Sequence, residues 1–182
     1  LKTALIEYGD TKMKIEVPND ATILTPEDLR HDPPASEPYK ATQRALENPL
    51  RMSPLKDLVK PGDRVVILCP DRVKGGSHEQ SHRKVSIPLM VEELKKGGVN
   101  LKNIELMICG GLHKKNTLQE MRGYLGDKII NLFWPDRLVQ HDAEDKDNLV
   151  SFGRDEMGDV VEFNKKVAEA DLAISIGHTL GN

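Results

Sequence analysis

Three short apolar runs constrain the fold of this chain more than any other feature of its sequence. They cover residues 64–69, 103–109 and 171–177, and each has the length of a buried strand. An amphipathic stretch that begins at Ser86 lies between the first two runs, and a pair of glycines ends it. Between the second and third runs, Thr117 and Glu120 have the spacing of a capping box that opens a short helix, and residues 127–133 are compatible with either a helix or a strand. Apolar strands that alternate with helices indicate βαβ units and a parallel sheet with both faces covered. We therefore predict an α/β fold with a mostly parallel, Rossmann-like sheet and flanking helices.

Two further segments are typical of β-hairpins that lie outside this sheet. Residues 3–8 and 12–17 flank a Gly-Asp-Thr turn, and the second run alternates apolar and charged side chains. The same reasoning predicts a hairpin from residues 148–153 and 159–163. We place the first hairpin within residues 1–20 and expect both to be peripheral.

Composition excludes several classes of function. The chain has 182 residues and a net charge of -3, and its Lys and Arg residues form no run that would indicate nucleic-acid binding. No apolar stretch approaches the roughly 20 residues that span a bilayer. Two cysteines and no signal peptide at the start favour a reduced, cytoplasmic compartment. We expect Cys69 and Cys109, each at the end of an apolar run, to be small buried residues.

Each of the three predicted strands leads into glycine and a titratable side chain. Ligands of open parallel sheets bind beyond the carboxyl ends of the strands, and glycine lets the backbone approach them closely. A histidine there can act as a general acid or base near neutral pH. We expect the side chains after these strands to converge on one pocket; they are Asp71, Arg72, Lys74, His113 and His178. The alternative is that the glycines only make turns and that the histidines are hydrogen-bonded surface residues.

One motif favours a rival chemistry. His78, Glu79 and His82 match the H-E-x-x-H pattern, in which two histidines on one helical face bind zinc and the glutamate acts as a base. The match lies in a polar stretch, and no further zinc-binding extension follows it. We therefore predict no metal ligands and keep zinc hydrolysis as a minor alternative. Neither of the common glycine-rich nucleotide motifs occurs.

The order of the segments resembles the N-terminal domain of the nickel-dependent lactate racemase family. The resemblance covers roughly residues 45–182, in the pieces VVILCPDRVK, ICGGLHKKNTLQEM, QHDAED, EFNKKVAEADLAISIG and HTLGN. It implies that residues 1–182 are the N-terminal catalytic domain of a longer two-domain racemase or epimerase of 2-hydroxy acids. It also implies hydride transfer to a tethered nickel-pincer nucleotide, with two histidines that alternate as acid and base on the substrate hydroxyl. Cofactor-synthesis enzymes would supply that nucleotide.

The resemblance also implies roles for individual residues. His113 matches the first catalytic histidine, and Asp71 matches an acidic position from which we expect it to orient Lys74 and Arg72. Lys74 stands where the family has an arginine that grips the substrate carboxylate, and Arg72 can compensate for the lost bidentate fork. Room for the cofactor would come from Gly110, Gly111 and Gly177.

The C-terminal end of the chain departs from the family pattern. An ungapped comparison puts Asn182 where the second catalytic histidine is expected, and His178 could replace it only if the loop runs differently. The family's tethering lysine and nickel-ligating histidine are expected beyond residue 182. We therefore expect the 182 residues alone to be inactive. A module that binds a small anion without turnover is the alternative function on the same fold.

Overall fold

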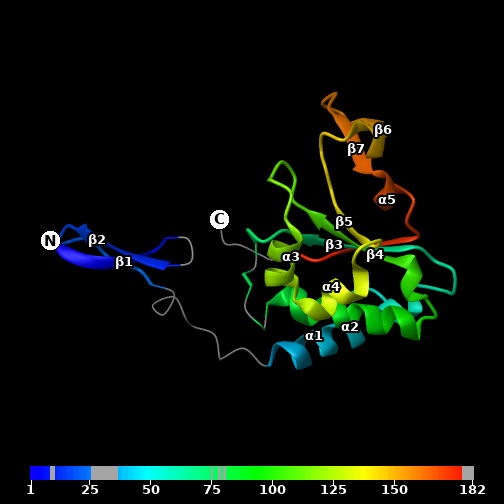
Figure 1. Cartoon of the computed structure of the whole chain (residues 1–182), viewed down its shortest axis with the longest axis horizontal. Coiled ribbons are helices and arrows are strands. Elements are labelled where there is room, and N and C mark those ends of the chain that lie inside the picture. The colour runs from blue at the N-terminus through cyan, green and yellow to red at the C-terminus, as the bar shows by residue number, and fades with distance from the viewer. Residues whose placement is uncertain (9–10, 26–36, 75, 78, 80, 178–182) are drawn as a thin grey trace. The chain divides into compact units, whose positions relative to one another are not determined.

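The computed structural model describes residues 1–8, 11–25, 37–74, 76–77, 79 and 81–177. The chain divides into two compact units, Leu1–Ala35 and Ser36–Asn182. In the first unit, β1 (Lys2–Tyr8) and β2 (Thr11–Val17) pair antiparallel from Lys2 opposite Val17 to Tyr8 opposite Thr11 (Figure 1). The predicted N-terminal hairpin is therefore present, and it forms a sheet of its own.

A parallel sheet organises the second unit, as predicted. Its strands are β3 (Val65–Pro70), β4 (Ile104–Cys109), β5 (Leu138–Gln140) and β8 (Leu172–Ser175), in the order β5-β4-β3-β8. All three neighbouring pairs are parallel. Sequence analysis missed β5, because a three-residue edge strand carries too little periodicity to be recognised. It also extended β8 two residues too far.

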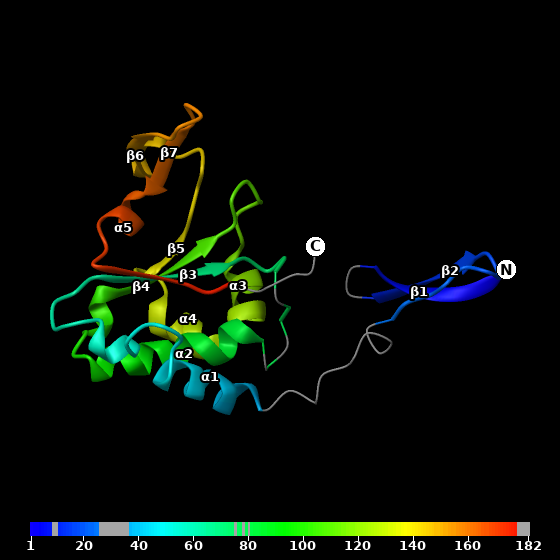
Figure 2. The same ribbon diagram turned by 180° about the vertical axis from the view of Figure 1, so that it is seen from behind.

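The helices between these strands lie on one face of the sheet (Figures 1 and 2). They are α2 (His82–Lys96), α3 (Leu118–Leu125) and α4 (Asp127–Phe133). A capping box of Thr117 and Glu120 opens α3, which confirms that prediction, and the segment left open as helix or strand is α4. The predicted start of α2 at Ser86 was four residues too late, because its first turn carries charged residues that hid the apolar period.

Shorter elements complete this layer. Helix α1 (Pro38–Glu47) packs on α2 and contributes no buried residue of its own. Three 3-10 helices, η1 (Leu55–Asp57), η2 (Leu101–Asn103) and η3 (Lys146–Asn148), lie in the connections. No helix in the described parts of the chain is long and apolar enough to cross a membrane.

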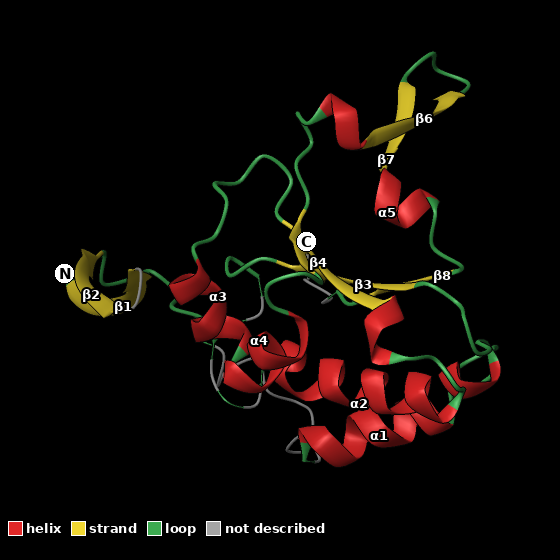
Figure 3. Cartoon of the chain, turned by 45° about the vertical axis from the view of Figure 1, so that its right-hand side comes forward, coloured by secondary structure: helices red, strands yellow, loops and turns green. Residues whose placement is uncertain are grey.

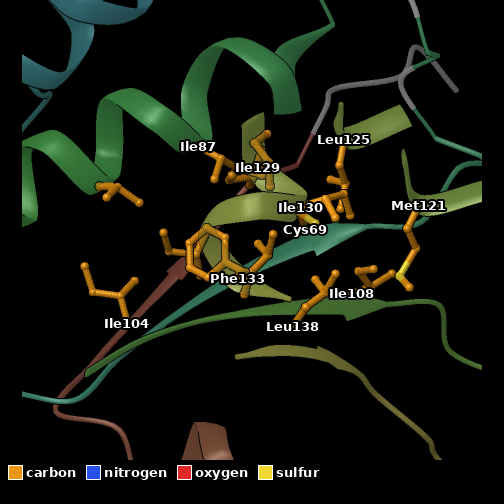
Figure 4. Packing of buried hydrophobic residues seen from close by; sticks show 14 of the residues in the cluster. Cys69, Ile87, Ile104, Ile108, Met121, Leu125, Ile129, Ile130, Phe133 and Leu138 are labelled. Carbon is orange, nitrogen blue, oxygen red and sulfur yellow. The ribbon is translucent and has the colours of Figure 1, made fainter. Parts of the chain in front are cut away.

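The hydrophobic core fills the space between the sheet and α2, α3 and α4 (Figure 4). Alternate strand residues point into it, so Val65, Ile67 and Cys69 of β3 lie beside Ile104, Leu106 and Ile108 of β4. The helices contribute the remaining large side chains, among them Ile87, Leu94, Leu125, Ile130 and Phe133.

The opposite face of the sheet has a much thinner cover. It lies towards α5 (Lys165–Ala168) and the hairpin of β6 (Leu149–Arg154) and β7 (Val160–Asn164), as Figure 3 shows. Val66 and Met107 are buried on this face, but Ala173 and Ser175 are exposed. The prediction that both faces are covered was therefore only partly right. The second peripheral hairpin is present as predicted.

The strand order places a topological switch point between β3 and β8. The connections from β3 to β4 and from β4 to β5 cross the face with α2, α3 and α4, whereas the connection from β5 to β8 crosses the other face. Ligands of such sheets bind beyond the carboxyl ends of the strands at this point.

Ile67→Ala tests the assignment of the core. Ile67 is fully buried in the middle of β3, so its truncation should lower the free energy of unfolding by about 2–5 kcal/mol, measured by urea denaturation. Leu50→Ala removes an exposed side chain and should change that free energy by about 0.5 kcal/mol or less. Equal effects of the two substitutions would contradict the described core.

Candidate active site

Parallel register brings two distant loops together at the carboxyl edge of the sheet. Pro70, the last residue of β3, pairs with Cys109, the last residue of β4, so both strands end at the same level. Asp71 follows one strand and the Gly110-Gly111 pair follows the other. The loop after β4 then places Nδ1 of His113 at 2.7 Å from Oδ2 of Asp71.

The pair of Asp71 and His113 has the geometry of an oriented general base. The Asp71 side chain is only 3% exposed, whereas the His113 side chain is 51% exposed. The second carboxylate oxygen of Asp71 accepts a hydrogen bond of 3.1 Å from the N–H of Val73. Because a carboxylate can only accept, the neutral ring carries its proton on Nδ1. Nε2 is left with a lone pair that can take a proton from a bound molecule.

The glycine pair shapes the turn that carries His113. The carbonyl of Gly110 accepts a hydrogen bond of 2.9 Å from the N–H of His113, and Gly111 has a φ of +58°. A positive φ at the second residue of such a turn favours glycine. A Cβ on Gly110 would lie at ordinary contact distance from Asp71 and His113, at 3.7 and 3.8 Å. It is therefore the positive φ of Gly111 that lets the chain reverse and bring His113 back onto Asp71.

The far end of the same loop is held by a residue that sequence analysis missed. Gln140, the last residue of β5, accepts a hydrogen bond of 2.6 Å from the N–H of Asn116 and donates one of 2.8 Å to its carbonyl. The side-chain amide thus pairs with the backbone as a neighbouring strand would. Gln140 begins the piece QHDAED of the family resemblance, but we predicted no role for it because β5 itself was not recognised.

Arg83 was also missed, and it holds the loop after β3. Its side chain is fully buried, and its guanidinium donates to backbone carbonyls of residues 70–76. The guanidinium carbon lies 4.7 Å from the centre of the Tyr124 ring. Burial lowers the pKa of Arg83 and raises that of Tyr124. In the sequence, nothing distinguished Arg83 from the charged residue beside it at the end of the zinc-like motif.

The predicted anion-binding residues lie at the same edge but do not pair with Asp71. Arg72 is largely exposed, and its Nε lies 4.0 Å from Oε1 of Glu120. Lys74 is exposed, and its N–H donates to the Asp71 carbonyl at 3.3 Å. The carboxylate of Asp71 is occupied by His113 and Val73, and not by the two cations that we expected it to orient.

The remaining predicted residues fall at or beyond the end of the described chain. Gly177 is exposed, and a Cβ added to it would meet nothing within 4 Å. His178 and Asn182 lie outside the described residues.

The cysteines differ from each other. Cys69 is buried as predicted, and burial raises its pKa to about 12. The prediction that Cys109 is buried was wrong, because the last residue of β4 points away from the helices onto the thinly covered face.

The zinc-like motif lacks the helix that its chemistry needs. Helix α2 begins only at His82, after Ser81 at its N-cap, and Glu79 lies in the preceding turn. His78 and Gln80 lie outside the described residues. Among the residues that the structure describes, no three His, Cys, Asp or Glu side chains gather as metal ligands would.

The tautomer of His113 tests this geometry directly. At a pH where the ring is neutral, we expect the Nδ1–H form to dominate, because Asp71 accepts from Nδ1. Side-chain ¹H–¹⁵N NMR of the chain distinguishes the two tautomers. Asp71→Ala removes the acceptor and should move His113 to the Nε2–H form that free imidazole favours in water. A wild-type ring protonated on Nε2 would rule out the proposed base.

Comparison with known proteins identifies the family. The family model of the lactate racemase N-terminal domain matches residues 8–180. The chain is 28% identical over 174 residues to the lactate racemase of Thermoanaerobacterium thermosaccharolyticum, an alignment that covers 94% of this chain and 38% of that protein. It is 26% identical over 138 residues to the lactate racemase of Lactiplantibacillus plantarum, covering 76% of this chain and 30% of the relative.

A solved structure agrees with the sequence matches. The lactate racemase apoprotein from Thermoanaerobacterium thermosaccharolyticum superposes with a TM-score of 0.71 at 25% identity, over 96% of this chain and 38% of the other. The chain thus spans less than two-fifths of the length of these relatives. The predicted family is confirmed: this chain belongs to the lactate racemase family and matches its N-terminal domain.

Proposed function

We propose that this chain is the N-terminal catalytic part of a racemase or epimerase of 2-hydroxy acids, with His113 as an acid and base on the substrate hydroxyl. The observation that carries this proposal is the hydrogen bond of 2.7 Å between Nδ1 of His113 and the buried carboxylate of Asp71. It leaves Nε2 directed away from the carboxylate on a half-exposed ring. Membership of the lactate racemase family supports the reaction class.

The chemistry of a 2-hydroxy acid explains why such a base is needed. When the hydrogen on the substrate carbon leaves with both bonding electrons, the hydroxyl oxygen becomes a carbonyl and must lose its proton. Nε2 of His113 would take that proton, and the charge on Asp71 would stabilise the imidazolium that forms. Return of the hydrogen to the other face, with proton transfer back to oxygen, completes the inversion.

The nickel-pincer nucleotide that the resemblance implies would accept the hydride and return it. The backbone at Gly111 and Gly177 leaves room for a large group, because an added Cβ would meet nothing within 4 Å there, whereas a Cβ on Gly110 would contact Asp71 and His113. Among the described residues, no three His, Cys, Asp or Glu side chains form a set of metal ligands. We therefore assign the acid–base chemistry to this chain, and we assign the nickel ligand and the tethering lysine to residues beyond 182.

The substrate carboxylate would meet the cations of the loop after β3. Lys74 is exposed at the carboxyl edge and supplies a point charge in place of the arginine fork. Arg72 is available as well, since its contact with Glu120 at 4.0 Å is an exposed ion pair of the weak kind. This difference from the family pattern favours a 2-hydroxy acid other than lactate. The second acid–base group would be His178, because Asn182 cannot carry a proton.

Two partners follow from this proposal. The relatives are more than twice as long as this chain, which supports a C-terminal domain that closes the site. Enzymes that synthesise the cofactor would have to load it. A module that binds a small anion without turnover is the competing function, and the absence of a histidine at Asn182 favours it.

His113→Ala separates the two functions. In the full-length protein, with candidate 2-hydroxy acids, the substitution should lower the racemisation rate by about 10²–10⁴ and leave substrate affinity within a few-fold. Leu112→Ala is a matched control in the same turn, because that side chain is 81% exposed and carries no proton. Unchanged turnover in the His113 variant, or a protein that binds the acid and never racemises it, would overturn the catalytic role.

The mass of the full-length protein tests the cofactor. When it is produced together with the cofactor-synthesis enzymes, we expect an intact mass above that of the polypeptide and stoichiometric nickel by elemental analysis. Without those enzymes, the mass should equal that of the polypeptide. An unmodified, nickel-free protein in both preparations would contradict the cofactor assignment and favour the binding module.

A further inference from the structure

Arg83 is an unusual residue to bury, because a guanidinium loses its hydration when it leaves water. It is fully buried and is among the largest side chains in the protein with no accessible surface. Its hydrogen-bond acceptors in the described chain are carbonyl oxygens and not carboxylates.

All of these acceptors belong to the loop that carries Asp71. One nitrogen, Nη1, donates to the carbonyls of Pro70 at 3.2 Å and Asp71 at 2.6 Å, and to that of Lys74. The other, Nη2, donates to the carbonyl of Gly76 at 2.6 Å. Four carbonyl dipoles that point at one centre repel each other unless a cation lies between them. The guanidinium is therefore the centre around which this loop is folded.

The other side of Arg83 faces the element that follows the His113 loop. Its guanidinium stacks on the ring of Tyr124, which is buried in α3. Helix α3 begins right after Thr117, so its position and that of the His113 loop depend on each other. Arg83 thus lies between the loop that carries Asp71 and the helix that follows the His113 loop.

We propose that Arg83 is a positioning residue that holds the backbone of Asp71 against α3 and thereby sets the tautomer and direction of the His113 ring. The inference rests on the proposed role of His113 as an acid and base. In the described chain the hydrogen bonds of Arg83 go to the loop of Asp71 and not to His113, so its effect would be exerted through Asp71. The residue directly after the zinc-like motif is, in this view, the one that holds this loop.

Only arginine fits this position. The planar guanidinium offers five donors in a fixed fork and can satisfy several carbonyls while its face stacks on a ring. Lysine keeps the charge but has a single nitrogen, so it cannot serve both the carbonyls around Nη1 and the Gly76 carbonyl at Nη2, and it has no planar face to stack on Tyr124. The conservative substitution Arg83→Lys should therefore fail to restore the site.

Arg137 provides a matched control. It too donates to backbone carbonyls, those of Leu101 at 2.6 Å and Leu132, and its guanidinium lies 5.7 Å from the centre of the Phe133 ring. It precedes β5 at the amino end of the sheet, away from Asp71 and His113. Loss of either arginine removes the same kinds of contact, but only Arg83 holds the loop of Asp71.

The experiment reads the His113 tautomer by side-chain ¹H–¹⁵N NMR in the 182-residue chain, without cofactor or substrate. We expect Nδ1–H as the major form in wild type, in Arg137→Lys and in Arg137→Met. In folded Arg83→Lys and Arg83→Met, it should become the minor form. If Arg83→Met does not fold, Tyr124→Leu, which removes only the ring under the guanidinium, should shift the tautomer in the same direction.

The outcomes distinguish this inference from the proposed function. A wild-type tautomer in folded Arg83 variants, or an equal shift in the Arg137 variants, would overturn the positioning role and leave His113 as the base. A selective shift in the Arg83 variants supports the role even if the full-length protein shows no racemase activity. Protein stability, measured on the same samples, shows whether the two arginines contribute comparably to the fold.

Discussion

The parallel pairing of β3 with β4 is the constraint on which the rest of the site depends. Because Pro70 and Cys109 are partners, the two strands end at the same level and their following loops start side by side. A shift of one residue would turn the core side chains of β3 to the thinly covered face. The same register that buries Ile67 thus brings Asp71 and His113, 42 residues apart in the chain, to within 2.7 Å.

Polar side chains then hold the two loops where hydrophobic packing cannot. One side chain from another element holds the backbone of each loop. Arg83 of α2 bonds the loop after β3, and Gln140 of β5 bonds the loop after β4. Removing a buried guanidinium from water costs several kcal/mol, and one hydrogen bond to a charged group returns about 1.5–3 kcal/mol. Arg83 therefore needs most of its carbonyl partners, and this requirement ties the conformation of the loop to the fold.

Sequence reasoning found the strong periodic signals and missed the weak ones. Runs of apolar residues revealed β3, β4 and β8, and the capping box at Thr117 marked the start of α3. The three residues of β5 carried no periodicity, so that strand was not predicted, and neither was the role of Gln140 at its end. Cys109 looked like part of a buried run, but alternation along β4 places it on the face that the helices do not cover. Arg83 looked solvated because four of its partners are backbone atoms, which no pattern of side chains reveals.

The sequence by itself determined the α/β class, the family and the candidate residues Asp71 and His113. Local patterns were sufficient for these because strand periodicity, glycine after a strand and the order of motifs are properties of neighbouring residues. Only the tertiary structure decided that Asp71 pairs with His113 and not with Arg72 and Lys74, and that the buried Arg83 holds the loop of Asp71. These contacts join segments that are distant along the chain. They depend on strand register and on which groups are removed from water, and both are consequences of the packed fold.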